Sequence, residues 1–321
     1  MSRTPTQQAN TTSDGQEGHA TPIAIVDALK TVAGDPPKVR ASFAKGQCVR
    51  GRFEPTVEAT KITCSASFTQ ASVVRGRFAM GGGNPDVPDT NKLVVRGLAL
   101  HLGEGAKSSD LLVENAPVHF AKSLDQMLAF LRARYPGPNG QPDPAKVKAF
   151  SEANPETLNQ ARFIAARPLP GSFAGTTYWG VHSFKAINAR SETCLIKFKV
   201  VPPAGEIVVG NDGADSLSAD FLFQDLAARI RQGGVRFDVL AILGRPGDPT
   251  EDVTARWPDE DNRAIVKLGA IVIDELSDNE ACDATIFNPS NLADGIIHPT
   301  DEIFKARAEA YAASLARRRD Q

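Results

Sequence analysis

The sequence predicts an α+β fold in which helices surround an antiparallel β-barrel. Several segments are rich in β-branched and aromatic residues and alternate apolar with polar side chains, whereas others repeat apolar residues every three or four positions. Strands and helices do not alternate one to one, and the sequence holds no internal repeat, so a parallel βαβ sheet is disfavoured. An antiparallel barrel with helical insertions fits this order best.

Composition and charge exclude several classes of protein. The chain has 321 residues, 41% hydrophobic and 23% charged, which is enough for a sizeable core. A formal net charge of −2 disfavours a nucleic-acid partner, because such binding needs a basic surface. No run approaches the roughly 18 apolar residues of a membrane span. The first residues are polar and lack the apolar segment of a secretory signal, so we expect a cytoplasmic protein.

The chain is predicted to consist of a short arm and one domain. Residues 1–21 are rich in Thr, Gln, Ser and Gly, the composition of a disordered arm. No linker of disordered composition divides residues 22–321, which we therefore take as a single domain. The cysteines Cys48, Cys64, Cys194 and Cys282 lie far apart. Their spacings fit neither a zinc site nor a disulfide framework, so we expect buried free thiols.

The first predicted elements are a helix and a series of strands. Residues 22–34 predict a helix, because apolar residues recur at helical spacing and Gly34 precedes a Pro pair. Its core-facing residues are Ile23, Ile25, Val26 and Leu29. Strands are predicted at residues 61–68, 72–78, 92–102, 176–188 and 194–201. In the last of these, Ile196 and Phe198 flank Lys197, the alternation of a half-buried strand.

Helices and loops interrupt the strands. Helices are predicted at residues 123–135, 144–153 and 218–234. In the third, Leu222, Leu226 and Ile230 recur at four-residue steps, and Gly233 ends the helix. Loops are predicted for the Gly- and Pro-rich runs 81–89 and 135–144. Two more strands, 236–243 and 264–274, precede the final helix.

The C-terminal helix, residues 298–321, carries the sharpest local clue. It has Thr300 as a plausible cap, an acidic first turn and an arginine-rich end. Its predicted inner face holds Phe304, Arg307, Tyr311, Leu315 and Arg318. A guanidinium one turn before a tyrosine favours the phenolate, which is one of the few protein ligands used for ferric heme. The alternative is a core tyrosine beside an arginine that extends to solvent.

Several segments, taken together and in order, resemble the heme catalases, in particular the short catalase-related peroxidases. The segments are "RASFAKGQCVRGRFEPT", "VVRGRFAMGGGNPDVPD", "DLLVENAPVHF", "TTYWGVHSFKAINA", "VRFDVLAIL", "DPTEDVTARWP" and "FNPSNLADGI…RAEAYAASLARRR". The resemblance covers nearly all of residues 22–321. It implies a catalase-like eight-stranded antiparallel β-barrel with surrounding helices that forms one heme-binding domain.

The resemblance also implies a cofactor and its iron ligand. Catalases bind one heme b per subunit through a tyrosine in an Arg-x-x-x-Tyr pattern that follows a Phe-Asp-Pro-like turn. Here the turn is at residues 287–289, and the pattern runs from Arg307 to Tyr311. By this resemblance Tyr311 ligates the iron as tyrosinate, and Arg307 holds it ionised.

Further positions in the matched segments imply residues that contact the cofactor. Heme carries two propionates, and buried carboxylates need hydrogen-bonding cations. The arginines at the matching positions are Arg40, Arg77 and Arg318. Val74, with Phe78, is expected to line the pocket beside Arg77. Phe120 matches an aromatic residue near the heme, with a plain core residue as the alternative, and His119 is expected in the same wall rather than as a ligand.

The chain departs from the family on the distal side of the heme, where a histidine, a serine or threonine and an asparagine are expected. These positions hold Phe43, Ala79 and Glu114, although a shift of one residue would place Asn115 at the last. Acid–base help from a distal base is worth about 10²–10⁴-fold in rate, and a phenyl ring supplies none. Glu114 could replace it as proton carrier if burial raises its pKa. The alternative is a surface glutamate.

These residues predict a heme b-dependent peroxidase that uses hydrogen peroxide or organic hydroperoxides with a small-molecule electron donor, and with weak or absent catalase activity. The alternatives are a heme isomerase or dehydratase acting on an organic hydroperoxide or an N–O substrate, and a non-catalytic heme-binding protein. The family further implies a possible homo-oligomer. Phe43 is either native or a substitution made to probe the distal position; Ala79 and Glu114 favour the first, because they differ from the family too.

Overall fold

The structure is a computed structural model that describes residues 19–210, 213 and 216–320. Residues 1–18 of the predicted arm therefore lie outside the described residues. His19, which the arm was expected to include, is described: its Nδ1 lies 3.0 Å from Asp125 Oδ2. The Ala20 N–H donates to the other oxygen of Asp125. The last part of the predicted arm thus contacts the domain.

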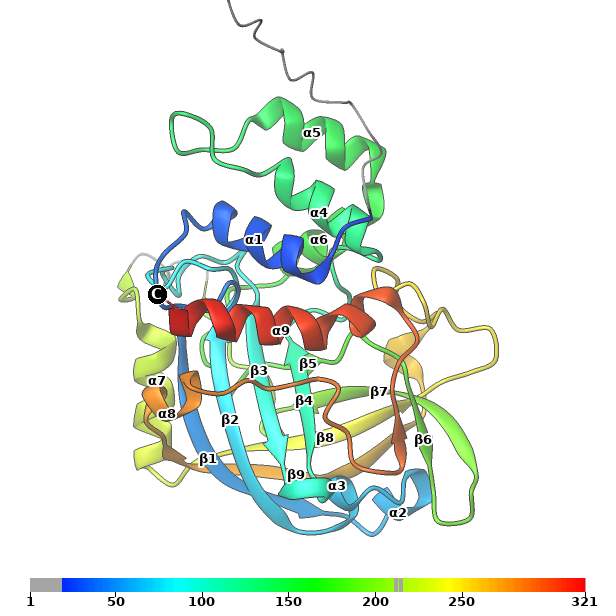
Figure 1. The fold of residues 1–321 in the computed structure, drawn as a ribbon. Helices are drawn as coiled ribbons and strands as arrows, with labels where there is room; N and C mark the ends of the chain where they lie inside the picture. The colour runs from blue at the N-terminus through cyan, green and yellow to red at the C-terminus, as the bar shows by residue number, and fades with distance from the viewer. Residues whose placement is uncertain (1–18, 211–212, 214–215, 321) are drawn as a thin grey trace, which may run out of the picture.

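An antiparallel barrel forms the centre of the molecule (Figure 1). Its strands are β1 (Gly46–Pro55), β2 (Ser72–Met80), β3 (Arg96–Leu102), β4 (Ser109–Glu114), β5 (Tyr178–Trp179), β7 (Thr193–Val201), β8 (Val235–Leu243) and β9 (Ile265–Leu276). They pair in the order β7-β5-β4-β3-β2-β1-β9-β8, and the β7–β8 pairing closes the ring. β6 (Phe184–Ile187) and β10 (Ile296–Ile297) extend the sheet beyond β7. The predicted eight-stranded antiparallel barrel is confirmed.

The barrel interior is an aromatic and aliphatic core. Along β2 the side chains of Val74 and Phe78 are buried in this core. The Phe78 ring packs against Phe173, Tyr178 and Phe237 at centroid distances of 5.4, 6.4 and 6.0 Å. Because side chains alternate along a strand, the two neighbours of Phe78, Arg77 and Ala79, point to the outer face of the barrel. The candidate site lies on that outer face.

Helices cover the outside of the barrel. They are α1 (Pro22–Val32), α2 (Ala59–Ile62), α3 (Ala66–Thr69), α4 (Leu124–Arg132), α5 (Pro144–Ala153), α6 (Asn159–Ala165), α7 (Phe221–Arg231), α8 (Asn279–Asp283) and α9 (Glu302–Asp320). Single 3₁₀ turns occupy Gly105–Lys107, Pro155–Leu158 and Glu260–Asn262. In Figure 1, α9 crosses the barrel wall and α1 lies over α9, with α4 and α5 beyond. A second, smaller core joins α1 to α4 through Ile25, Ala28, Leu128 and Leu131.

Several sequence-based assignments need correction. The strand predicted at 61–68 is instead the two short helices α2 and α3. The predicted cap Thr300 does not cap α9; the Asp301 side chain accepts from the Phe304 N–H at 2.8 Å. Ile23 is 46% exposed rather than core-facing. β1 and β4 were not assigned as strands, because their local patterns mix charged and apolar residues.

The expectation of free, buried thiols is also wrong. Cys48 and Cys282 form a disulfide across a sequence separation of 234 residues. Barrel closure explains it, because β1 pairs with β9 and α8 follows β9 directly. Cys64 is a free thiol but exposed, and Cys194 is half-buried. Within the described ranges, no helix has the length and apolar character needed to cross a bilayer.

One charged pair lies inside the packed layers and gives a test of the fold. Lys197 Nζ lies 3.1 Å from Glu260 Oε2, with side chains 3% and 1% exposed. Glu260 keeps a second cation when Lys197 is removed, because Arg256 Nε lies 3.4 Å from Oε1. Lys197→Met should therefore lower the free energy of unfolding by about 1.5–3 kcal/mol, the range for losing a hydrogen bond to a charged group. Urea unfolding measures it.

A matched surface control comes from Arg52, which pairs with Glu54 and Asp274 and is 53% exposed. Arg52→Met should change the free energy of unfolding by less than about 1 kcal/mol. Equal losses for Arg52→Met and Lys197→Met would contradict the assignment of Lys197 to a buried pair.

Candidate active site

A cavity of about 320 Å³ lies between the outer face of the barrel and helices α1 and α9. Its volume is in the range of ligand-binding cavities. Most of the residues predicted for the site line it: Arg40, Phe43, Arg77, Glu114, Phe120, Arg307, Tyr311 and Arg318. These residues come from four separate parts of the chain, so only the fold brings them together.

The strand register builds the floor of the cavity. Ala79 on β2 faces Gly97 on β3, and Gly97 faces Glu114 on β4. These three residues therefore form one row across the sheet, with side chains on the same face. The next row, Arg77, Ala99 and Leu112, lies beside it. Register alone thus places the Glu114 carboxyl on the face where Arg77 enters the cavity.

Phe43 packs over this floor. Gly97 has no Cβ, and one added there would lie 2.6 Å from Cε1 of Phe43. The phenyl ring therefore occupies the space above Gly97, in the same row as Ala79 and Glu114. Phe43 adopts a φ of +54°, which is unusual for a bulky residue and indicates that its surroundings hold it in place.

Arg77 supplies part of that constraint. Its Nη1 donates to the Phe43 carbonyl at 2.8 Å, and its Nη2 donates to the Ala44 carbonyl at 2.9 Å. Both terminal nitrogens of this buried guanidinium are therefore committed to the backbone at Phe43. A change at Arg77 is expected to move the Phe43 ring as well as the charge.

A chain of hydrogen bonds ends at Tyr311. Arg307 Nη2 donates to the phenolic oxygen at 2.8 Å, and Arg307 Nη1 lies 2.9 Å from His182 Nε2. His182 Nδ1 lies 2.9 Å from Asp301 Oδ2. Because an arginine can only donate, Nε2 must accept and Nδ1–H must donate to Asp301, which sets a neutral tautomer.

Electrostatics agree with that arrangement. Burial lowers the pKa of His182, and the hydrogen bond and charge of Asp301 oppose this effect without overcoming it. Burial alone acts to raise the pKa of Asp301, but the hydrogen bond and charge of His182 bring it below its ordinary value. Asp301 is thus an anion and His182 neutral at neutral pH. The pair orients Arg307, which in turn fixes the Tyr311 oxygen.

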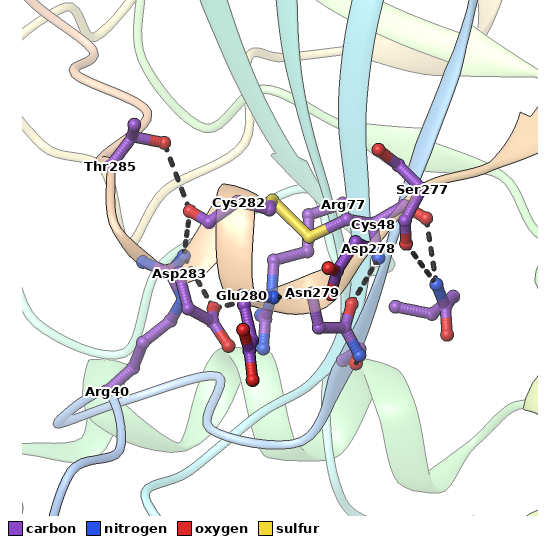
Figure 2. Close-up of a disulfide and its surroundings, with 12 residues drawn as sticks. Arg40, Cys48, Arg77, Ser277, Asp278, Asn279, Glu280, Cys282, Asp283 and Thr285 are labelled. Carbon is purple, nitrogen blue, oxygen red and sulfur yellow. Dashed lines mark hydrogen bonds and ion pairs between the residues drawn. A yellow bond between two sulfur atoms is a disulfide. The ribbon is translucent and has the colours of Figure 1, made fainter.

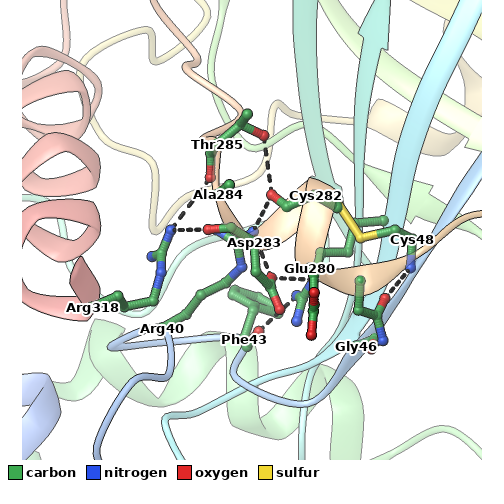
Figure 3. Close-up of polar contacts among 12 residues, drawn as sticks. Arg40, Phe43, Gly46, Cys48, Glu280, Cys282, Asp283, Ala284, Thr285 and Arg318 are labelled. Atoms are coloured by element: carbon green, nitrogen blue, oxygen red, sulfur yellow. Dashed lines mark hydrogen bonds and ion pairs between the residues drawn. A yellow bond between two sulfur atoms is a disulfide. The ribbon is translucent and has the colours of Figure 1, made fainter. Parts of the chain in front are cut away.

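Three arginines meet at one end of the cavity, as Figure 3 shows for Arg40 and Arg318. Arg40 Nη2 donates to Asp283 Oδ1 at 3.0 Å. Arg77 Nε lies 3.7 Å from the same oxygen, beyond hydrogen-bond distance. Arg318 Nη2 donates to the Asp283 carbonyl at 3.1 Å. Asp283, 45% exposed, is the carboxylate that these cations share.

The arginine cluster leaves donors for a ligand. In the described part of the chain, the Nε atoms of Arg40, Arg77 and Arg318 are all buried without a hydrogen-bond partner. Burial lowers the pKa of Arg77 to about 9, helped by the charge of Arg40 and opposed by Asp283. Burial and the charge of Arg40 lower the pKa of Arg318 to about 10. Crowded, partly unsatisfied cations fit a ligand with two carboxylates, as the two propionates of heme provide.

Glu114 is poised between its two protonation states. Burial raises its pKa to about 7, and the charge of Arg307 and a hydrogen bond from Gln160 act the other way. Gln160 Nε2 donates to Glu114 Oε1 at 2.7 Å and to the Val118 carbonyl at 2.9 Å. A carboxyl with this pKa can both accept and return a proton near neutral pH.

The aromatic residues divide between the cavity and the core. Phe120 lines the cavity beside His119, with ring centroids 4.3 Å apart. Burial lowers the pKa of His119 to about 4, so its ring is neutral and, as expected, forms part of the wall. The prediction that Val74 contacts the cofactor is corrected, because Val74 lies in the barrel core and not among the residues that line the cavity. Strand alternation places Val74 and Phe78 on the face opposite Arg77.

Sequence reasoning missed three residues that support the site. His182 and Asp301 orient Arg307, and Gln160 holds Glu114. A histidine in the apolar segment "WGVHSF" and an acidic residue at the start of the last helix were available signals for the first two. Gln160 carried no signal, because its contact with β4 depends on how the segment after α5 folds back.

Comparison with known proteins agrees with this geometry. A family model described as Catalase matches residues 6–320. The chain is 35% identical over 303 residues to a catalase-related peroxidase of Synechococcus elongatus, covering 93% of this chain and 88% of the relative. It is 29% identical over 304 residues to a catalase-related peroxidase of Mycolicibacterium paratuberculosis, covering 93% and 95%.

The chain belongs to the catalase family. Its fold agrees: catalase A from Saccharomyces cerevisiae superposes with a TM-score of 0.78 at 21% identity, over 92% of this chain and 64% of that one. The short catalase-related subgroup is also supported, and with it a heme-dependent enzyme of the peroxidase class. Among the described residues no group of three or more His, Cys, Asp or Glu side chains could hold a metal ion.

The two perturbed groups of the cavity give opposite pH dependences to the heme-free chain. The pKa of His119 is about 4 when folded, against 6.5 when unfolded, so the unfolded state binds more protons and stability falls as pH drops from 6.5 to 4. His119→Phe lacks this titration. Its free energy of unfolding, measured relative to that of the parent, should therefore be about 3 kcal/mol more favourable at pH 4 than at pH 7.

Glu114 works in the other direction. Its pKa is about 7 when folded, against 4.5 when unfolded, so the folded state binds more protons and stability falls as pH rises from 4.5 to 7. Glu114→Gln should therefore gain stability over the parent as pH rises through this window. Urea unfolding between pH 4 and 8 measures both differences. A difference from the parent that does not change with pH, for both variants, would contradict the burial of these groups in the cavity.

Proposed function

We propose that this catalase-family chain is a heme b-dependent peroxidase that uses hydrogen peroxide or an organic hydroperoxide, with little dismutation of hydrogen peroxide. One observation carries the proposal: a single cavity joins the Arg307–Tyr311 hydrogen bond, the arginine cluster, and Glu114 in the same row as Phe43. The cluster binds carboxylates, Tyr311 is an anionic ligand for ferric iron, and Glu114 moves protons.

Each residue has a distinct part in this proposal. Heme, when bound, supplies the redox-active iron at which the peroxide is reduced. Tyr311 binds the iron, and Arg307 keeps its oxygen in place by donating to it. Arg40, Arg77 and Arg318 bind the two propionates through their buried Nε donors.

The distal residues set the reaction. Phe43 can neither take nor return a proton, so the distal imidazole that assists dismutation in the family is lacking and proton transfer is left to Glu114. Glu114 accepts a proton from the bound peroxide and returns it to the leaving oxygen, with Oε1 held by Gln160. The apolar wall of Phe43, Phe120 and Leu112 favours organic hydroperoxides over hydrogen peroxide.

The proposal includes a small-molecule electron donor and, by family resemblance, assembly into a homo-oligomer. It also places the protein in the cytoplasm, where thiols are mostly kept reduced.

Glu114→Gln tests the proton carrier. Loss of the carboxyl should lower peroxidase kcat with cumene hydroperoxide by about 10²–10⁴-fold, because no other group replaces it. Glu104→Gln, at an exposed glutamate, is the matched control and should leave kcat unchanged. Turnover that survives in Glu114→Gln would rule out the carboxyl as proton carrier.

Phe43→His tests the distal position. Histidine adopts positive φ more readily than phenylalanine, so it should fit at +54° and supply the missing base. Oxygen evolution from hydrogen peroxide should rise by about 10²-fold or more, whereas Phe43→Leu should leave it low. If Phe43→His gains nothing, the ring is not what limits dismutation.

The phenyl ring in place of a base also favours a second function, rearrangement of an organic hydroperoxide without a proton shuttle. Product analysis of the parent separates the two functions. A rearranged product formed without consumption of any electron donor would favour an isomerase or dehydratase, and bound heme without turnover would favour a heme-binding protein.

A further inference from the structure

The last two residues of α8 and the two that follow them hold the outer edges of the arginine cluster. This acceptor loop, residues 282–285, presents its carbonyls and one carboxylate to side chains of the cluster (Figure 3). Arg40 Nη2 donates to the Cys282 carbonyl at 3.2 Å and to Asp283 Oδ1 at 3.0 Å. Arg318 Nη2 donates to the carbonyls of Asp283 and Thr285 at 3.1 and 3.3 Å.

This division of contacts orients two guanidiniums. The acceptor loop takes terminal Nη atoms of Arg40 and Arg318, while their Nε atoms are buried without a partner. A planar guanidinium held at its terminal nitrogen cannot rotate freely. The acceptor loop therefore determines which donors of Arg40 and Arg318 are left for a carboxylate in the cavity.

Polar contacts and one covalent bond hold the acceptor loop, and none of residues 282–285 belongs to either hydrophobic core cluster. Ala284 and Thr285 are exposed, while Cys282 and Asp283 are only half-buried. The bond from Cys282 to Cys48 is its covalent link to β1 (Figure 2). Hydrogen bonds also tie the residues just before it to β1, from the Cys48 N–H to Asn279 Oδ1 and from the Ser277 N–H to the Cys48 carbonyl, both at 2.8 Å. Cys48 in turn faces Arg77 across the β1–β2 pair.

We propose that the Cys48–Cys282 disulfide positions the carboxylate-binding arginines, so that its oxidation state sets the affinity for heme. Oxidised, it joins the acceptor loop to the strand next to Arg77 and keeps Arg40 and Arg318 oriented. Reduced, the acceptor loop loses its covalent link to β1 and keeps only the hydrogen bonds of the residues before it, so the acceptors of the arginines are less fixed and heme binds more weakly. This inference rests on the proposed binding of heme propionates by these arginines.

Reduction has a defined balance. A water-soluble phosphine attacks one sulfur, the S–S bond breaks, and water completes the reaction. The products are two thiols and the phosphine oxide, with two electrons taken from phosphorus and two protons from water. Cys282 is the more accessible of the two cysteines, because it is half-buried whereas Cys48 is 1% exposed.

The test compares two ligands. Hemin has two free carboxylates, whereas hemin dimethyl ester has none and keeps the same iron and ring. Both are titrated into the heme-free parent, the Cys48→Ser/Cys282→Ser variant and the phosphine-treated parent, and binding is followed by absorbance of the heme. Cys64→Ser/Cys194→Ser, which keeps the disulfide, is the matched control.

The expected result is selective. Loss of the disulfide, by either route, should weaken hemin binding about tenfold or more, as expected for losing hydrogen bonds to charged groups, and should leave ester binding unchanged. The control variant should match the parent for both ligands. The phosphine-treated parent keeps the test decisive if the double-serine variant does not fold.

The possible failures differ. A parent that binds hemin and its ester equally contradicts propionate binding by the arginines, and the inference falls with it. A parent that prefers hemin, with no change on losing the disulfide, overturns the positioning role alone. Equal weakening of both ligands also overturns it, because it shows a general loss of structure.

Discussion

The site depends on the burial of three guanidiniums at one end of one cavity. Arg40, Arg77 and Arg318 repel one another there, and burial and this repulsion lower the pKa of Arg77 to about 9. Buried cations with unpartnered donors are costly unless an anion joins them. Asp283 partly neutralises the cluster, and the proposed dicarboxylate ligand would complete it. The remaining features of the cavity, from the position of Phe43 to the acceptor loop, are organised around this charge.

The barrel makes the arrangement possible through its register. One row across β2, β3 and β4 holds Ala79, Gly97 and Glu114. Because Gly97 has no side chain, the Phe43 ring can pack directly over it. Arg77 then connects the two halves of the site, since its terminal nitrogens hold the Phe43 backbone while its Nε remains for a ligand. An apolar distal wall and a carboxyl with a pKa near 7 are therefore consequences of the same strand pairing.

Much of the fold and of the candidate site could be predicted from the sequence. The family resemblance relates segments that are far apart in the chain, whereas local patterns describe each segment only by itself. The barrel, and the residues now found around one cavity, followed from such matches. Features that depend on long-range contact did not: the Cys48–Cys282 bond needs β1 beside β9, and Gln160 reaches Glu114 only after the segment beyond α5 folds back. Val74 was misplaced because the strand's alternation, rather than its nearness to Arg77, decides which face it occupies.

The central claim is that Tyr311, held by Arg307, binds the iron of a heme whose propionates neutralise the arginine cluster. Electron paramagnetic resonance and absorption spectra of the hemin-loaded parent and of Tyr311→Phe test it most directly. We predict one heme per chain with high-spin ferric signals of phenolate ligation in the parent, and loss of those signals in Tyr311→Phe even where heme is retained. Identical spectra for the two proteins would contradict the account.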